Sequence, residues 1–192
     1  MKRKTFLFSC VLAFVMNANA QQPDSTAMAN WVKYMTPGKE HQMIASWDGT
    51  WEGEITMWMT PGAPPSKSKG VATNKMVLDG RYQQATYTGS FEGMPFNGMS
   101  TLAFDNAKKT FISTWIDNMG TGIMIGEGPW DEKSRSITLK GKMIDPTTGK
   151  ECDFREVFTI VDDDHQLLEM YGPDPATGKE FKTMEIRYTR KK

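Results

Sequence analysis

From residue 49 onward the chain is a succession of short segments in which apolar and polar side chains alternate. A period of two places every second side chain on the same face of a β-strand. Turn-forming residues separate the segments, as at Asp79-Gly80 and Asp105-Asn106. The ten predicted strands are Trp51–Met59, Lys69–Leu78, Arg81–Phe91, Gly98–Phe104, Thr110–Asn118, Gly122–Gly128, Ser136–Ile144, Cys152–Ile160, Gln166–Tyr171 and Phe181–Arg190. Connections this short join antiparallel neighbours, so the pattern predicts a meander.

A meander of this length has two exposed edges unless it closes on itself, and closure removes both. We therefore expect an all-β protein, an antiparallel up-and-down barrel of about ten strands. Before it, Met28, Trp31, Val32 and Met35 recur at helical spacing, and Pro37 interrupts the pattern. One or two short N-terminal helices should therefore precede the barrel. The expected division is 1–20 signal peptide, 21–48 helical segment and 49–192 barrel domain.

The first residues have the pattern of an export signal. A cationic start at Met1-Lys2-Arg3-Lys4 precedes an apolar run, which ends at Ala18-Asn19-Ala20, a small-x-small cleavage site. We expect cleavage near Ala20 and a periplasmic or secreted protein with no transmembrane segment. Lipidation at Cys10 is the weaker alternative, because most of the apolar run follows that cysteine. The mature chain would keep Cys152 alone and form no internal disulfide.

The loops predict two different barrel ends, because alternate loops of a meander lie at opposite ends. One set is mostly long and rich in Pro, Gly, Met and Phe: Thr60–Ser68, Glu92–Asn97, Asn118–Thr121, Asp145–Glu151 and Pro173–Glu180. The other set is mostly short and charged: Asp79-Gly80, Asp105–Lys109, Trp130–Arg135 and Val161–His165. We expect the first end to be an open mouth and the second a closed base, where the helices meet the first strand.

A set of short motifs resembles a known family. Gly49-x-Trp51 is similar to the signature of the calycin barrels, such as lipocalins and fatty-acid-binding proteins. In those barrels the Trp plugs the closed base under a basic residue of the last strand, here Arg190 or Arg187. The wider pattern is Gly49-x-Trp51-x-Gly53, Leu78-Asp79-Gly80-Arg81, Gly98 ahead of Phe104-Asp105, and Trp115-Ile116-Asp117. Over about residues 44–188 it is similar to DUF1579, exported bacterial proteins of unknown function. The resemblance implies a calycin-like (lipocalin-like) fold and supplies no catalytic residue.

Several classes of chemistry find little support in the sequence. Lys plus Arg and Asp plus Glu both total 23, so no net charge points to nucleic acid. Only His41 and His165 are present, one expected half-exposed in the second helix and one in a base turn, so no cofactor, haem included, is expected. The same shortage of histidines argues against a zinc site or a nucleophile triad. Met57 and Met59 invite a copper(I) hypothesis, but alternation separates them from Trp58, and cavity filling explains methionines better.

The more informative residues are polar groups on apolar faces. Glu156 shares a strand face with apolar side chains, so it is either a ligand anchor or half of an ion pair. Asp117 lies on the same side as Trp115 near the mouth, where it either contacts a ligand or caps a turn. Met94 and Phe96, in a predicted mouth loop, add exposed apolar surface.

Three hypotheses follow from these residues. The first is a binding protein for a small hydrophobic or amphipathic molecule, with no catalytic residue and no metal. Its expected ligand-binding residues are Trp58, Tyr87, Met94, Phe96, Trp115, Asp117 and Glu156. The second is an enzyme that uses Glu156 and Asp117 as acid and base. The third is a structural or interaction protein with a filled barrel. The sequence favours binding over catalysis and does not give the ligand or the oligomeric state.

Overall fold

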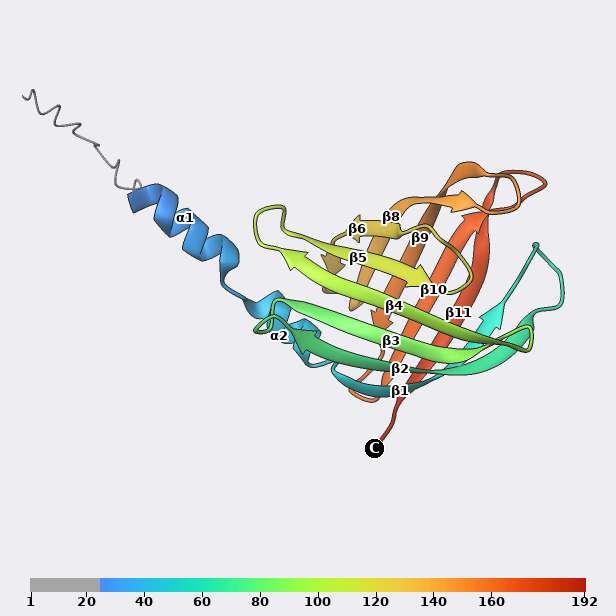
Figure 1. The fold of residues 1–192 in the computed structure, drawn as a ribbon, viewed down its shortest axis with the longest axis horizontal. Helices are drawn as coiled ribbons and strands as arrows, with labels where there is room; N and C mark the ends of the chain where they lie inside the picture. Colours follow the sequence, from blue (N-terminus) through green and yellow to red (C-terminus); the bar gives the residue numbers. More distant parts are fainter. Residues whose placement is uncertain (1–24) are drawn as a thin grey trace, which may run out of the picture.

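The protein is a closed antiparallel barrel with helices at its N-terminal end (Figure 1). The structure is a computed structural model, and it describes residues 25–192. The expected signal peptide and Cys10 lie outside the described residues. The elements are α1 Ser25–Met35, α2 Lys39–Ala45, β1 Gly49–Met57, β2 Ser66–Val77, β3 Tyr82–Phe91, β4 Met94–Asp105, β5 Thr110–Asp117, β6 Met124–Gly128, β7 Trp130–Asp131, β8 Ser136–Asp145, β9 Lys150–Ile160, β10 His165–Pro173 and β11 Glu180–Arg190.

The strands form one sheet that closes on itself. Its order is β6-β5-β4-β3-β2-β1-β11-β10-β9-β8-β7, and β6 also pairs with β8. Because β6 and β7 both pair with the same edge of β8, the eleven strands occupy ten positions around the barrel. The break between them falls at Pro129, which has no N–H to donate, and Gly128 there lies directly against the Thr138 backbone. The predicted ten-stranded antiparallel barrel is confirmed.

The base of the barrel is plugged by Trp51, which is 1% exposed. The Arg190 guanidinium lies 4.1 Å from the centroid of its ring. Arg190 also donates hydrogen bonds to the backbone oxygens of Asp48 (2.6 Å) and Ser46 (3.0 Å). Of the two arginines considered from the sequence, Arg190 therefore packs on the tryptophan, whereas Arg187 pairs with Glu185 on the outer surface.

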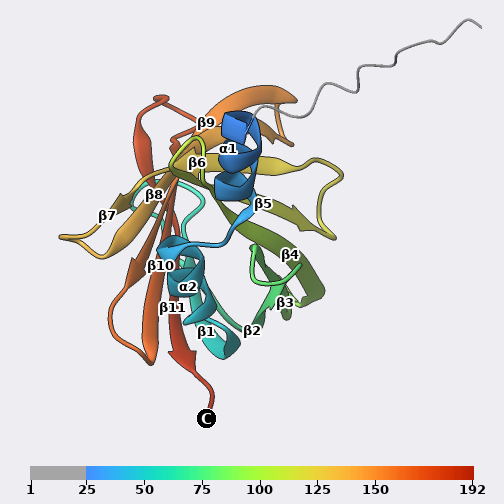
Figure 2. The same ribbon diagram turned by 90° about the vertical axis from the view of Figure 1, so that its left-hand side faces the viewer.

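Helix α2 lies across the base opening, as the view from that end shows (Figure 2). Ile44 and the following Trp47 are buried in a cluster that also contains Phe104, Phe111, Ile137, Leu139 and Ile160. His41 was expected to be half exposed, but it is only 5% exposed. Its Nδ1 accepts a hydrogen bond from the Gly38 N–H (3.0 Å), and burial lowers its pKa. The histidine is thus a structural residue of the helix start.

Helix α1 stands away from the barrel and buries no residue (Figure 1). Its C-terminal end is bonded to the barrel through Arg81 Nε to Met35 O (3.1 Å) and Asn106 Nδ2 to Tyr34 O (3.0 Å). The predicted interruption at Pro37 is confirmed, since the helices end and begin on either side of it. No helix among residues 25–192 is long and apolar enough to cross a membrane.

One predicted boundary is wrong in an informative way. Met94 and Phe96 were expected in a mouth loop, but both lie in β4, which pairs with β3 as far as Phe91↔Met94. The connection is only Glu92-Gly93, and both residues have a positive φ (50° and 80°), as a tight hairpin turn requires. The rigid wall of the mouth is therefore taller on this side than the sequence indicated.

Candidate functional site

The inner face of the barrel is filled at the base and partly open toward the mouth. Most inward-facing residues in the base half are buried, among them Trp51, Ala72, Ala85, Phe111, Leu139, Gln166 and Tyr188. Many inward-facing residues nearer the mouth keep part of their surface accessible: Ile55, Met57, Tyr87, Trp115, Met143, Met170 and Met184. The interior is therefore a cup whose floor is made by the side chains above Trp51.

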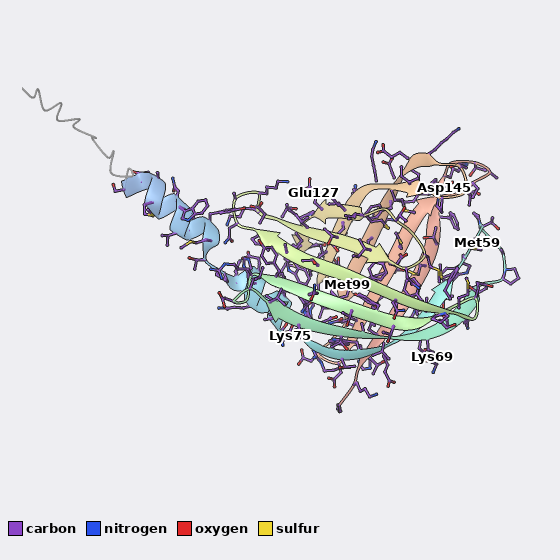
Figure 3. All side chains as sticks on the ribbon, in the orientation of Figure 1. Met59, Lys69, Lys75, Met99, Glu127 and Asp145 are labelled. Carbon is purple, nitrogen blue, oxygen red and sulfur yellow. The ribbon has the colours of Figure 1, made fainter. Side chains whose placement is uncertain are left out.

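A hollow of about 190 Å³ lies at the rim of the mouth, lined by Met57 of β1, by residues 66–68 at the start of β2 and by residues 90–93 at the β3–β4 turn. Met59 and Asp145 mark this end of the molecule, whereas Lys75 lies toward the base (Figure 3). A larger groove, about 320 Å³, lies outside the barrel between α2 and Trp130. None of the buried, unpartnered polar atoms of the described chain belongs to that groove. The interior is therefore the better candidate site.

One wall of the cup is an aromatic cluster around Trp115. Its ring lies 4.9 Å from that of Tyr87 at an edge-to-face angle, and 6.2 Å from that of Phe96 in a stacked arrangement. The Trp115 Nε1 donates to Asp117 Oδ2 (2.7 Å). Oδ1 of the same carboxylate accepts from the backbone N–H groups of Met119 and Gly120. Asp117 thus fixes the tryptophan and caps the turn after β5.

Gly98 of β4 makes room for this tryptophan. A Cβ at that position would overlap the Trp115 ring. We expect Gly98→Ala to displace the indole and to cost about 1–3 kcal/mol of unfolding free energy, with a shifted Trp emission spectrum. Gly172→Ala in β10 is the matched control, since its new Cβ would meet only Thr183 at 3.5 Å. Equal effects of the two substitutions would contradict the packing role of Gly98.

Glu156 is the carboxylate enclosed in the barrel. It lies on β9 between Leu139 of β8 and Met170 of β10, both apolar. Burial alone raises its pKa to about 7, since no hydrogen bond or neighbouring charge contributes. The residue nevertheless keeps some accessible surface, which indicates that it faces the interior space. Of the two alternatives drawn from the sequence, the ion pair finds no partner among the described residues.

Two tyrosines lie near this carboxylate. Tyr87 comes from β3, on the opposite wall, and Tyr188 from β11. Burial raises the pKa of Tyr87 and holds that of Tyr188 well above its usual value, and Glu156 adds to both shifts. The two hydroxyls therefore stay neutral. Tyr188 is 6% exposed, and its hydroxyl has no partner in hydrogen-bonding geometry although Tyr87 lies close by.

A row of thioethers continues from Glu156 around the wall. In the strand register Met57 lies opposite Met184, and Met184 lies opposite Met170, which pairs with Glu156. All four side chains point inward. Methionine is flexible and polarisable, so this row can adapt to the shape of an apolar group.

One of the expected site residues lies elsewhere. Trp58 follows the inward-facing Met57, so it points outward, where Lys182 Nζ lies 5.5 Å from its ring centroid. Lys182 is itself paired there with Glu169 (3.0 Å) and Glu185 (2.5 Å). Met94 shares a strand face with Phe96 and lies at the rim, where it is 49% exposed. The structure thus brings Tyr87, Phe96, Trp115, Asp117 and Glu156 to the inner face.

The geometry gives no support to the acid–base pair or to a metal site. Both oxygens of Asp117 already accept hydrogen bonds from the protein. Within residues 25–192, no cluster of three His, Cys, Asp or Glu side chains is placed to hold a metal. His165 is the first residue of β10 at the base, and its Nδ1 lies 2.8 Å from Asp162 Oδ1.

The family described as "Protein of unknown function (DUF1579)" matches residues 36–190 of the 192. The chain belongs to this family. The glycine and tryptophan positions that pointed to it have structural roles in this member: Trp51 plugs the base, and Gly98 accommodates Trp115. No curated protein matches the chain.

Two solved structures share the fold. The S-type phycobiliprotein lyase CPES from Guillardia theta has a TM-score of 0.58 at 10% identity, over 84% of this chain and 97% of that one. Rv2717c from M. tuberculosis has a TM-score of 0.58 at 13% identity, over 82% of this chain and all of that one. At these identities the likeness shows the fold alone.

Tyr188 was not expected from the sequence as part of the inner face, and methionines were expected to fill the cavity but not to form a row. The signal was present, because Met184, Ile186 and Tyr188 alternate in phase with the inward-facing residues of β1. Using it required the register between the first and last strands, which local patterns do not give.

Proposed function

We propose that this protein binds a small, partly apolar molecule in the open half of the barrel. The observation that carries the proposal is the change along the inner face from buried residues at the base to accessible ones at the mouth. A cup with aromatic walls and a few enclosed polar groups is the usual form of a small-molecule site. One protein of the same fold is a phycobiliprotein lyase, and a barrel-held ligand is compatible with that fold.

We also propose that the protein is exported, on the pattern of residues 1–20. Native mass spectrometry of protein purified from its own cells tests both proposals. A chain that begins at Gln21, with an extra mass that is lost on denaturation, is the expected result.

The neutral fluorophore N-phenyl-1-naphthylamine gives a second test of the binding proposal. We expect its emission to rise in the presence of the protein and Ser68→Trp to abolish the rise, because Ser68 lines the mouth hollow and a Trp there would fill it. Lys69→Trp is the matched control, since the neighbouring Lys69 points outward and is 82% exposed. Equal fluorescence from both variants would place the probe outside the barrel and contradict the proposal.

A further inference from the structure

The inner face of the barrel carries carboxylates without balancing positive charges. Between Lys150 at the rim and Arg190 at the base, the inward-facing positions of the strands carry no lysine or arginine. They do carry carboxylates, of which Asp117 is bonded to the turn after β5 and Glu156 is unpartnered. An unpaired carboxylate in such a place is costly unless something else supplies the opposite charge.

The groups that face Glu156 do not supply it. The neighbours on β8 and β10 are Leu139 and Met170. The titratable groups near it on β3 and β11 are Tyr87 and Tyr188, and both are neutral phenols. Arg155, the next residue on β9, points outward and is held by Glu180 (2.6 Å) and the Tyr171 ring.

The surrounding walls suit a positive charge. The faces of aromatic rings attract cations, and Tyr87, Trp115 and Phe96 present a cluster of such rings. The buried Tyr188 hydroxyl, which lies close to Tyr87, offers oxygen lone pairs to an N–H donor. The thioether row of Met57, Met184 and Met170 is apolar and adaptable.

Building on the proposed function, we propose that the ligand is an organic cation. It would carry a protonated amine or amidine nitrogen on an aromatic or aliphatic body. The nitrogen would bind the Glu156 carboxylate beside the Tyr188 hydroxyl, and the body would pack between the aromatic wall and the thioether row. The ligand thus supplies the counter-charge that the barrel lacks.

Binding of such a cation depends on pH. Burial raises the pKa of Glu156 to about 7, and only the ionised carboxylate pairs with a cation. Affinity should therefore fall as the pH is lowered from 8 to 6, and binding near pH 7 should release a proton.

Three probes with the same body separate this proposal from binding in general: 2-naphthylmethylamine, 2-naphthylmethanol and 2-naphthoate. We expect the amine to bind about 10–100-fold more tightly than the alcohol at pH 8, and the acid most weakly. Glu156→Gln should remove the advantage of the amine and leave the affinity of the alcohol unchanged. Glu151→Gln, on the outer face of the same strand, should change neither. Titration calorimetry in two buffers of different ionisation enthalpy measures the affinities and the proton released.

The outcomes separate this proposal from the proposed function. If the alcohol binds and the amine binds no better, or if Glu156→Gln does not reduce amine binding, the organic-cation proposal is wrong and the barrel still binds ligands. If neither these probes nor N-phenyl-1-naphthylamine binds, both proposals are overturned.

Discussion

Replacing Trp51 with alanine is expected to lower the free energy of unfolding by about 3–5 kcal/mol, the usual cost of removing a buried tryptophan. The side chain is 1% exposed and closes the base, so nothing nearby can fill the space that it leaves. The substitution also removes the ring under Arg190 and the hydrogen bond from Trp51 Nε1 to Trp47 O (3.1 Å). Urea unfolding followed by circular dichroism measures the change.

Trp31→Ala is the control for this prediction, because Trp31 lies on α1 and is 61% exposed. It should change stability by no more than about 0.5 kcal/mol. Similar losses from the two substitutions would mean that Trp51 does not hold the base together.

The second large effect is expected from Glu156→Gln, which should stabilise the protein at pH 8. The folded chain holds the Glu156 proton with a pKa of about 7, against a usual value of 4.5. Between these values the folded state binds more protons than the unfolded state, so this residue lowers stability as the pH rises through that window. The loss of stability is complete above pH 7. It amounts to about 2–3 kcal/mol, somewhat less than the full pKa shift implies, because Glu156 keeps some contact with solvent. Glutamine cannot ionise and avoids the loss.

The measurement is the difference in unfolding free energy between wild type and Glu156→Gln from pH 4 to pH 8. Taking the difference cancels the titration of the surface carboxylates. The two proteins should be nearly equal at pH 4 and diverge toward pH 8, whereas Glu151→Gln should show no such divergence. A difference that is independent of pH would show that Glu156 has an ordinary pKa and would remove its special role.

Glu156 is thus expected to lower the stability of the protein without a ligand and to raise it when a cation is bound. Such a group fits selection for ligand binding better than selection for stability. The Glu156→Gln variant would be more stable than the wild type and would lose its preference for cations.

Local sequence patterns were sufficient to predict the fold. Alternation and turn residues depend on neighbours in the chain, so strands such as Thr110–Asp117 were placed almost to the residue. The resemblance to calycins suggested that Arg190 or Arg187 packs on Trp51, and counting loops placed Trp51 and Arg190 at the same end, because a meander fixes which loops share an end. The hairpin at Glu92-Gly93 was missed because Pro95 resembles a loop residue. Pro95 fits in the strand because β5 pairs with β4 only from Gly98 onward.

The site was harder to predict from the sequence, because its residues come from strands far apart in the chain. The direction of Trp58 depends on which strand face is inward, and alternation alone leaves that choice open. Whether Glu156 has a partner depends on β3, β8, β10 and β11 together. Sequence reasoning could flag the carboxylate as unusual, but only the assembled barrel shows that its surroundings hold no opposite charge.

The closure of the barrel also determines when the chain can fold. The first strand pairs with the last, and the hydrogen bond from Arg190 to Asp48 joins residues 142 positions apart. During synthesis β1 therefore has only β2 as a partner until nearly the last residue has been made. Contacts of such long range form late and slowly. The barrel should thus remain unclosed until the C-terminal strand has been synthesised.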